Sequence, residues 1–344
     1  MKIVHLFWHT LLFCPLIITS LVFVPVVQAE KPIQLSFSVF FPPTHPHAVA
    51  SEKMAAEIEA RSNGRVRITV FPGGTLTKAQ AVYAGVVDGI SDMGHSAFAY
   101  TRGRFPVMEA VDLPLGYPDG KTASKVAYEF YKTMAPKELQ DVKVLTIHAH
   151  GPGILATTKD VSSLKDMKGM KIRSTGLSSK LAGQLGAAPV AMPQNAAYEA
   201  LQKGVVEGTI CPIETLKGWK QGEIIDYIIE SKAFGYTTSM FVVMNKKKYN
   251  SLPEDIQKIF DEVGEEWVSV HGQVWDDADM DGRAFVTGLG KTIHALPAEE
   301  DARWNDKVQL LITEYQNAMK EKGIAGETAV ELIKELLSNS PDRS

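Results

Sequence analysis

The sequence predicts an α/β protein built from two open α/β lobes, joined by hinge crossings and spanned by one long helix. Residues 168–212 alternate short strands and helices in the order β-α-β-α-β, which is one half of an open parallel sheet. A Gly-Val-Val-acid-Gly pattern at residues 85–89 recurs at residues 204–208. A helical pattern that starts at Pro253 and continues to about Met280 is long enough to lie across two lobes.

The elements around the second copy of the repeat are the clearest. Met170–Arg173 has the pattern of a short strand, and apolar residues from Leu177 recur at helical spacing until Gly186 ends the helix. The elements expected next are strand Pro189–Met192, a helix from near Asn195 to Gly204, and strand Val205–Cys211. Arg173 therefore stands at the carboxyl end of a strand beside a helix start, where open α/β sheets bind ligands.

The first copy follows a similar order. Its expected elements are strand Ile33–Phe41, helix Lys53–Arg61, strand Arg65–Phe71 and helix Lys78–Ala84. In both copies we expect a helix that ends at the first glycine of the repeat and a short strand after it. Two such halves predict two similar lobes with a cleft between their strand ends, a favoured place for small-ligand sites. The alternative is that the repeated pattern is a common way to enter a strand and implies no second half.

The remaining segments supply the crossings between the lobes. Strand Val142–Ala149 is expected to lead into a first crossing at His150–Gly153, and the chain is expected to return near Phe234–Met240 into strand Ser239–Asn245. Residues from about 299 to 337 have a helical pattern with one strongly charged face. The predicted domains are a signal peptide at 1–29, lobe I at 30–150 plus about 239–278, lobe II at 151–238 plus about 279–335, and a flexible tail at 336–344.

Residues 1–29 have the composition of a secretory signal peptide. Lys2 is their only Lys, Arg, Asp or Glu, and a long apolar run ends in Val-Gln-Ala at Ala29. This ending predicts cleavage after Ala29 and a periplasmic location for the mature chain. The alternative is an uncleaved anchor, because the run is nearly long enough to span a bilayer. Two prolines interrupt the run and favour cleavage.

Charge and cysteine content narrow the classes of partner. The chain has 36 Lys and Arg against 40 Asp and Glu, so loss of Lys2 with the signal would leave a net charge of about −5. A mildly acidic chain without a basic block argues against nucleic acid and anionic membrane as partners. Cys211 is the only cysteine after residue 29, so no disulfide forms within the mature chain.

Several short motifs together identify a family that the chain resembles. They are Lys168-Gly169-Met170-Lys171-Ile172-Arg173, then Leu-Gly-Ala, Met-Pro, and Tyr198-x-Ala-Leu-x-x-Gly-Val-Val-Glu-Gly followed by Pro212. In order and spacing they resemble the DctP-type extracytoplasmic solute-binding proteins of TRAP transporters, over essentially the whole mature chain. The resemblance implies the two-lobed periplasmic binding protein fold. It also implies that Arg173 pairs with the carboxylate of an organic-acid ligand.

Departures from the family pattern point to the ligand class. A second arginine, frequent in binders of sugar acids and dicarboxylates, is replaced here by Pro152-Gly153-Ile154, and the usual asparagine before Pro212 is Cys211. One anion clamp with several aromatics nearby suits a monocarboxylate with an apolar or aromatic body, although each aromatic could instead belong to the core. Glu214 is expected to meet an amino or hydroxyl group of the ligand or to pair with a surface lysine. The expected ligand-binding residues are Arg173, Phe40, His45, Ser96, Phe98, Tyr100, Gly153, Thr175, Gln194, Cys211, Glu214 and Tyr236.

Patterns typical of catalysis or cofactor binding lack their structural context. Gly151-Pro152-Gly153 begins a dinucleotide-like match, but the β-branched run after it predicts a strand where that fingerprint needs a helix. The segment at Gly94 lacks the second glycine of a nucleophile elbow. His45-x-His47 and His148-x-His150 have no third ligand nearby in sequence, so we interpret them as surface or cleft-lining histidines. The sequence predicts no catalytic residue, metal or cofactor.

The sequence therefore predicts a periplasmic solute-binding subunit that captures an organic acid by lobe closure and delivers it to a TRAP permease. The expected partners are the acid and the small and large membrane subunits, and the expected state is a monomer. Two alternatives keep the fold: a ligand-sensing subunit of a receptor, and a C4-dicarboxylate or sugar-acid binder. A secreted enzyme acting on organic acids is a third alternative, because a fold alone does not determine function.

Overall fold

The computed structural model describes residues 31–340, so the predicted signal peptide at residues 1–29 lies outside the described residues. Residues 32–340 belong to one compact unit. Two separate sheets and the helices around them make up this unit, as the predicted α/β class requires. No helix in this part of the chain is long and apolar enough to cross a membrane.

The first sheet has five strands in the order β2-β1-β3-β10-β4. Strand β1 is parallel to β2 and β3, whereas β10 runs antiparallel to its neighbours β3 and β4. The bounds are β1 Ile33–Val39, β2 Val66–Phe71, β3 Met93–Ala97, β4 Val142–Ala149 and β10 Ser239–Asn245. The predicted bounds of β4 and β10 are confirmed.

The second sheet has six strands in the order β11-β9-β5-β8-β6-β7. Strand β6 is parallel to β7 and β8, which confirms the predicted β-α-β-α-β unit. Strand β5 is antiparallel to β8 and β9, and two short strands, β9 and β11, lack a prediction from the sequence. The bounds are β5 Gly153–Thr157, β6 Lys171–Ser174, β7 Ala188–Ala191, β8 Gly208–Pro212, β9 Tyr227–Glu230 and β11 Ile293–Ala295.

Two short crossings connect the sheets, and the helical residues 246–288 between β10 and β11 make a third connection. The chain leaves the first sheet after β4 and enters the second at β5, and it returns between β9 and β10. The crossings meet where Gly153 faces Tyr236: a Cβ at Gly153 would lie 2.2 Å from the Tyr236 ring. Glycine is therefore required there by the close approach of the second crossing to the first.

Eleven α-helices surround the sheets in the described part of the chain. Their bounds are α1 Pro46–Arg61, α2 Val82–Val87, α3 Gly120–Met134, α4 Leu164–Met167, α5 Leu177–Gln184, α6 Ala197–Gln202, α7 Thr215–Gly218, α8 Lys246–Asn250, α9 Glu254–Gly288, α10 Ala298–Glu321 and α11 Gly326–Ser338. Short 3-10 turns lie at Ala79–Ala81, Phe98–Tyr100, Met108–Asp112, Lys137–Leu139, Gln194–Ala196, Gln221–Glu223 and Lys232–Phe234. Because α11 continues to Ser338, residues 336–338 of the expected tail are helical.

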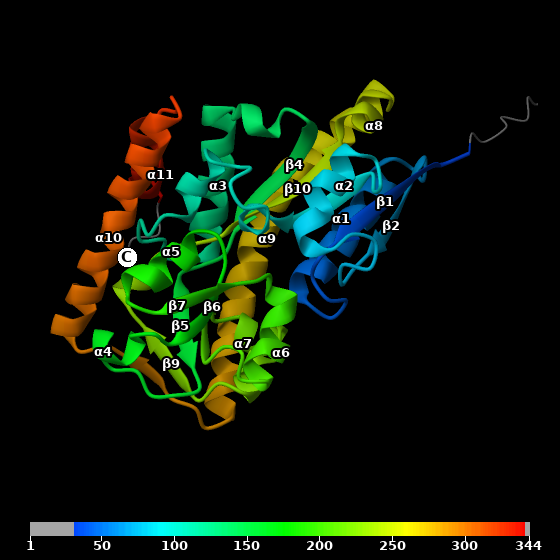
Figure 1. Cartoon of the computed structure of the whole chain (residues 1–344). Helices are drawn as coiled ribbons and strands as arrows, with labels where there is room; N and C mark the ends of the chain where they lie inside the picture. The colour runs from blue at the N-terminus through cyan, green and yellow to red at the C-terminus, as the bar shows by residue number, and fades with distance from the viewer. Residues whose placement is uncertain (1–30, 341–344) are drawn as a thin grey trace, which may run out of the picture. The chain divides into compact units, whose positions relative to one another are not determined.

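Helix α9 is the predicted long helix, and it contacts elements of both halves. Figure 1 shows it passing from beside β4 and β10 to beside α7. Glycines allow this close packing: a Cβ at Gly264 would lie 2.3 Å from the Leu145 carbonyl oxygen, and one at Gly282 would lie 2.4 Å from the Ile213 carbonyl oxygen. The helix has 35 residues and continues past Met280, the expected end.

Some predicted boundaries near the repeats are wrong. In the first copy, Gly85 and Val86 belong to α2 instead of ending a helix and starting a strand. Val82 and Val86, one turn apart, are fully buried and pack on β3 at Gly94, where a Cβ would lie within 2.7 Å of both side chains. In the second copy, β8 begins three residues later than the predicted Val205.

Helix α1 begins at Pro46, seven residues before the predicted start. Proline is favoured in the first helical turn, where its missing N–H has no partner to lose. His45 caps the helix, because its Nδ1 accepts a hydrogen bond from the backbone N–H of His47 at 3.2 Å. The cap fixes His45 at the edge of the region between the two sheets.

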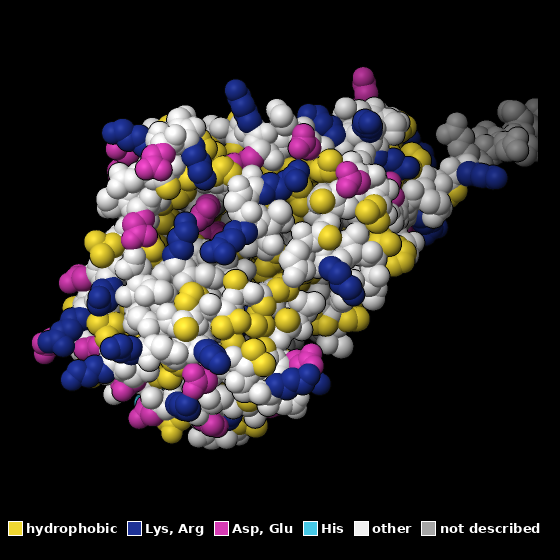
Figure 2. Space-filling view, viewed as in Figure 1, with side chains coloured by type: hydrophobic (Ala, Val, Ile, Leu, Met, Phe, Trp, Pro, Cys, Tyr) yellow, Lys and Arg dark blue, Asp and Glu magenta, His cyan; other side chains and the backbone are white. Residues whose placement is uncertain are grey.

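The surface of the described residues agrees with the mildly acidic composition. Figure 2 shows Lys and Arg interspersed with Asp and Glu over the visible face, with apolar groups gathered across its middle. No large area of one sign is seen on this face.

Candidate ligand-binding site

A small cavity of about 30 Å³ lies among residues from both sheets. Its lining comes from the ends of β6, β8 and β10, from both crossings and from the segment after β1. Eight of the predicted residues lie together in this lining: Phe40, Tyr100, Arg173, Thr175, Gln194, Cys211, Glu214 and Tyr236. The repeat-based prediction of a cleft between strand ends thus points to this place.

Arg173 is the cation of the cavity. It is 3% exposed, and its Nε and Nη2 donate to the Met192 carbonyl oxygen at 3.1 and 2.9 Å. Among the described residues no carboxylate oxygen lies within 4.0 Å of its guanidinium nitrogens. The carbonyl orients the guanidinium but supplies no negative charge. A buried charge without a counter-ion is costly, so this site favours an anionic ligand.

Four titratable groups near Arg173 are uncharged at neutral pH. Burial raises the pKa of Cys211 to about 11, although Arg173 acts in the opposite direction. Burial likewise raises the pKa values of Tyr100 and Tyr236 above the usual range of a phenol. Burial lowers the pKa of His150 to about 4, and Arg173 contributes to the shift. The thiol is therefore not a thiolate nucleophile, and none of these groups neutralises the arginine.

Gln194 provides a second donor in the cavity. Its side-chain Nε2 is buried and has no hydrogen-bond partner among the described residues. Its backbone N–H donates to the Tyr100 hydroxyl at 3.2 Å, which ties the first sheet's side of the cavity to the second. Buried donors without a partner are uncommon, and an anionic ligand would satisfy both Gln194 and Arg173.

Glu214 lies at the start of α7 and is 2% exposed. Its Oε2 accepts a hydrogen bond from His45 Nε2 at 3.0 Å. The direction follows from the other ring nitrogen: Nδ1 of His45 accepts from the His47 backbone, so the proton is on Nε2. The pair joins the cap of α1 to the second half of the molecule.

An aromatic wall closes another side of the cavity. Trp219 stacks on Phe40 with ring centroids 5.9 Å apart and planes 19° apart, and Tyr100 meets Phe40 edge-on at 5.3 Å. Trp219 is not among the ligand-binding residues expected from the sequence. The preceding Gly218 is the one sequence feature that marks this position as closely packed, because a Cβ there would lie 2.6 Å from Glu214 Oε2. Other lining residues that were not selected are Phe41, His150, Ser178, Ile210, Pro212, Thr215, Thr238, Met240 and Trp275.

Four predicted residues lie outside this lining. His45 contacts the lining residues Glu214, Phe41 and Trp219 without lining the cavity itself. Gly153 is the close-packed glycine behind Tyr236 and lines a different cavity. Ser96 is buried and donates to the Ala79 carbonyl oxygen at 2.8 Å, and Phe98 packs in the core against Phe105 and Phe241.

Four histidines form a fully buried group next to Phe41, namely His47, His95, His148 and His271. His47 and His148 are fully buried, so their interpretation as surface or cleft-lining residues is wrong. A third partner, His271 of α9, places ring nitrogens of all three within 4.8 Å of one another, a spacing that could hold a metal ion. Sequence spacing could not reveal it, because His271 is 224 residues from His47.

Hydrogen bonds engage both ring nitrogens of His148. Trp275 Nε1 can only donate, so His148 accepts at Nδ1, at 2.9 Å, and carries its proton on Nε2. That proton is donated to His95 Nε2 at 2.8 Å, and His95 then donates from Nδ1 to Ser51 Oγ at 2.9 Å. In this arrangement His148 has no free lone pair, whereas Nε2 of His47 and Nε2 of His271 have no hydrogen-bond partner among the described residues.

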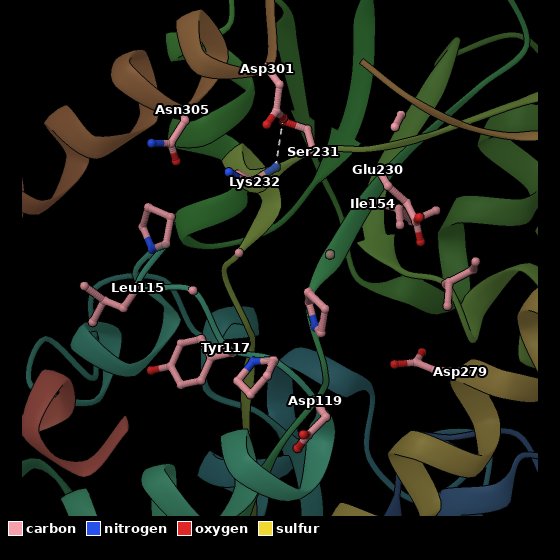
Figure 3. A pocket seen from close by; sticks show the side chains of 18 of the residues that line it. Leu115, Tyr117, Asp119, Ile154, Glu230, Ser231, Lys232, Asp279, Asp301 and Asn305 are labelled. Atoms are coloured by element: carbon pink, nitrogen blue, oxygen red, sulfur yellow. Dashed lines mark hydrogen bonds between the residues drawn. The ribbon is translucent and has the colours of Figure 1, made fainter. Parts of the chain in front are cut away.

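A larger cavity of about 1040 Å³ lies behind the crossings and has a different character. Figure 3 shows Asp279 and Ile154 on one side of it and Leu115 and Asn305 on the other. Charged side chains that line this cavity already have partners within the protein. Glu230 pairs with Arg283, and Asp301 accepts a hydrogen bond from the Lys232 backbone N–H at 3.0 Å. The small cavity, with its unpaired guanidinium, is therefore the better candidate.

Comparisons with known proteins identify the family. Residues 37–318 match the model of the bacterial extracellular solute-binding protein family 7, DctP. The C4-dicarboxylate-binding periplasmic protein DctP of Rhodobacter capsulatus is 26% identical over 309 residues, which cover 88% of this chain and 91% of that protein.

Two solved structures are similar in fold and sequence. A TRAP solute-binding protein from Rhodoferax ferrireducens, in complex with copurified benzoate, is 30% identical with a TM-score of 0.84, covering 89% of this chain and 98% of that one. A TRAP solute-binding protein of an unidentified marine microbe, specific for aromatic acids and in complex with metahydroxyphenylacetate, is 30% identical with a TM-score of 0.86, covering 90% and 100%. The chain therefore belongs to the DctP family of TRAP solute-binding proteins and has their two-lobed periplasmic binding protein fold.

Proposed function

We propose that this protein binds a monocarboxylate with an aromatic or apolar body in the small cavity and delivers it to a TRAP permease. The observation that carries the proposal is the buried Arg173 guanidinium, which is oriented by a carbonyl and has no carboxylate partner. A ligand carboxylate would supply the missing charge through charge-assisted hydrogen bonds. The buried Nε2 of Gln194 would donate to the same anion.

The lining supports one carboxylate and an aromatic body. Arg173 is the only Lys or Arg among the described residues of this lining, and Glu214 would repel a second carboxylate. Phe40, Trp219 and Tyr100 present ring faces and edges that suit an aromatic group. Benzoate and metahydroxyphenylacetate, which occupy the two similar structures, are acids of this class. These features favour a monocarboxylate over a C4-dicarboxylate or sugar acid.

The proposed mechanism is capture by lobe closure, without turnover. Lobe I would comprise residues 30–150 plus about 239–278, and lobe II residues 151–238 plus about 279–335. Contacts across the cavity, such as Gln194 with Tyr100 and Glu214 with His45, would form on closure and break when the ligand leaves. The permease subunits would distinguish the closed from the open form. We also propose that the signal peptide is cleaved after Ala29 and that the mature protein is a monomer.

Mass spectrometry of the small molecules that copurify with the protein tests this function. The protein would be isolated from its native host, washed, denatured, and its released molecules compared with those from an Arg173→Ala variant. We expect an aromatic or apolar monocarboxylate that the variant lacks. A dicarboxylate, or the same acid recovered equally from both proteins, would contradict the proposal.

A further inference from the structure

Arg173 and Glu214 bring opposite charges to one cavity without pairing with each other. Both side chains are almost fully buried and both line the cavity. The short N···O distances of an ion pair are absent between them, since Glu214 pairs with His45 and Arg173 bonds to the Met192 carbonyl. The space between them therefore has a cationic and an anionic end.

The pKa values of two other lining residues are influenced by both charges. Arg173 lowers and Glu214 raises the pKa of the Tyr100 hydroxyl, in each case as a smaller effect than burial. The same opposed influences act on the Cys211 thiol. Tyr100 comes from the first half of the chain and Cys211 from β8, and both line the same small cavity as the two charges. An occupant of that volume meets both.

Glu214 has one oxygen available for an occupant. Oε2 accepts from His45, whose tautomer is fixed by the backbone N–H of His47. Oε1 has no hydrogen bond to any described residue. A buried carboxylate oxygen cannot donate, so the group that completes this site must itself carry a hydrogen-bond donor.

We propose that the ligand is an aromatic monocarboxylate with a hydrogen-bond donor on its ring, a hydroxyl or an amino group, and that Glu214 is the residue that selects it. The carboxylate binds at Arg173, the ring lies against Phe40 and Trp219, and the donor is accepted by Glu214 Oε1. His45 is a positioning residue, because it holds the other oxygen. This inference rests on the proposed function and adds a requirement that acid binding alone does not impose.

Calorimetry with size-matched acids tests the requirement. The probes are phenylacetates with a 3-hydroxyl, a 3-amino or a 3-methyl group, measured with the full mature chain. We expect the first two to bind at least about tenfold more tightly than the 3-methyl acid, because hydrogen bonds to a charged acceptor are among the stronger ones. In Glu214→Gln the amide oxygen can still accept from His45, and its NH2 then faces the ring. The advantage of the 3-amino acid should disappear, and that of the 3-hydroxy acid should shrink.

The matched control is Glu199→Gln, which changes an exposed glutamate of α6 that pairs with Lys203. It should leave all three affinities unchanged. Equal binding of the three acids by the wild-type protein overturns the inference but leaves acid binding at Arg173 intact. Unchanged preferences in a folded Glu214→Gln also overturn it. Failure of every acid to bind would remove both this inference and the aromatic-acid function. If Glu214→Gln does not fold, the wild-type series alone decides.

Discussion

His45 Nε2 donates to Glu214 Oε2 at 3.0 Å, with both side chains almost fully buried. His45 caps α1, and Glu214 precedes α7, so the bond links segments 169 residues apart on either side of the cavity. A contact in this position breaks if the lobes separate. Substitution of either residue therefore tests lobe closure directly.

We expect His45→Ala to weaken closure and ligand affinity together, because the closed form would leave a Glu214 oxygen unpaired. Small-angle scattering should show that the wild-type protein becomes more compact with ligand and that the variant needs more ligand to do so. Lys180→Ala is the control, since its interlobe bond to Glu109 is partly exposed and contributes little. Identical wild-type profiles with and without ligand would contradict closure.

The buried histidines make stability depend on pH. Burial lowers the pKa of His47, His95 and His148 well below the usual value, and that of His271 to about 3. Below about pH 6.5 the unfolded chain takes up protons that the folded chain does not, so the free energy of unfolding falls as pH falls. We expect the loss between pH 6.5 and 5 in urea unfolding, with a slope of up to about 1.4 kcal/mol per pH unit for each histidine.

A single-residue comparison checks the assignment to this cluster. His271→Phe should reduce the slope of the free energy of unfolding against pH, below about pH 6.5, by the amount that corresponds to one proton. A change of His294, which is exposed and lies outside the cluster, serves as the control and should leave this slope unchanged. An acid limb that is as steep in His271→Phe as in the wild type would show that His271 titrates normally in the folded protein.

Two buried carboxyl groups act in the opposite direction. Burial raises the pKa values of Asp112 and Asp279 to about 8 each. They stay protonated in the folded chain where the unfolded chain loses their protons, so stability falls as pH rises from about 4 to 8. Together with the histidines this predicts a maximum of stability near pH 6.5. Asp112→Asn retains an acceptor for Ser239 and should flatten the alkaline side; Asp88→Asn, at an exposed site, should not.

Close packing of α9 predicts a further difference in stability. Gly264→Ala places a Cβ 2.3 Å from the Leu145 carbonyl oxygen and should destabilise by about 1–3 kcal/mol. Gly288→Ala, in the same helix, meets nothing within 4 Å and should be neutral or slightly stabilising, because alanine favours helix. Urea unfolding of the two variants compares them directly. Equal stability of both would mean that α9 shifts freely on the sheet.

Local patterns determined much of this fold. The strands β4 and β10 and the β6-α5-β7-α6-β8 unit follow from period and glycine stops within single segments. The boundary of α2 could not be predicted, because its valines keep helical geometry in order to pack on Gly94, a contact between segments. Short β9 and β11 exist because neighbouring strands pair with them.

Site residues at the ends of strands could be predicted from the sequence. Residues that distant helices contribute to the site were missed. Arg173 and Cys211 lie at the ends of predicted strands. Trp275 and His271 come from the middle of α9, and no spacing rule connects them with His148. Phe98 is an aromatic residue of the kind expected in the pocket, yet its side chain packs in the core against Phe241. Only the three-dimensional packing separates these cases.

The central claim is that Arg173 provides the carboxylate clamp, and calorimetry with the copurified acid and its amide tests it most directly. The wild-type protein should bind the acid and not the amide. Arg173→Ala should weaken acid binding at least about tenfold, and Arg173→Lys should not restore it, because an ammonium lacks the planar fork. Arg102→Ala, which removes an exposed arginine, serves as the control for folding and net charge. Acid binding by a folded Arg173→Ala that equals wild type, or a wild-type preference for the amide, would contradict the account.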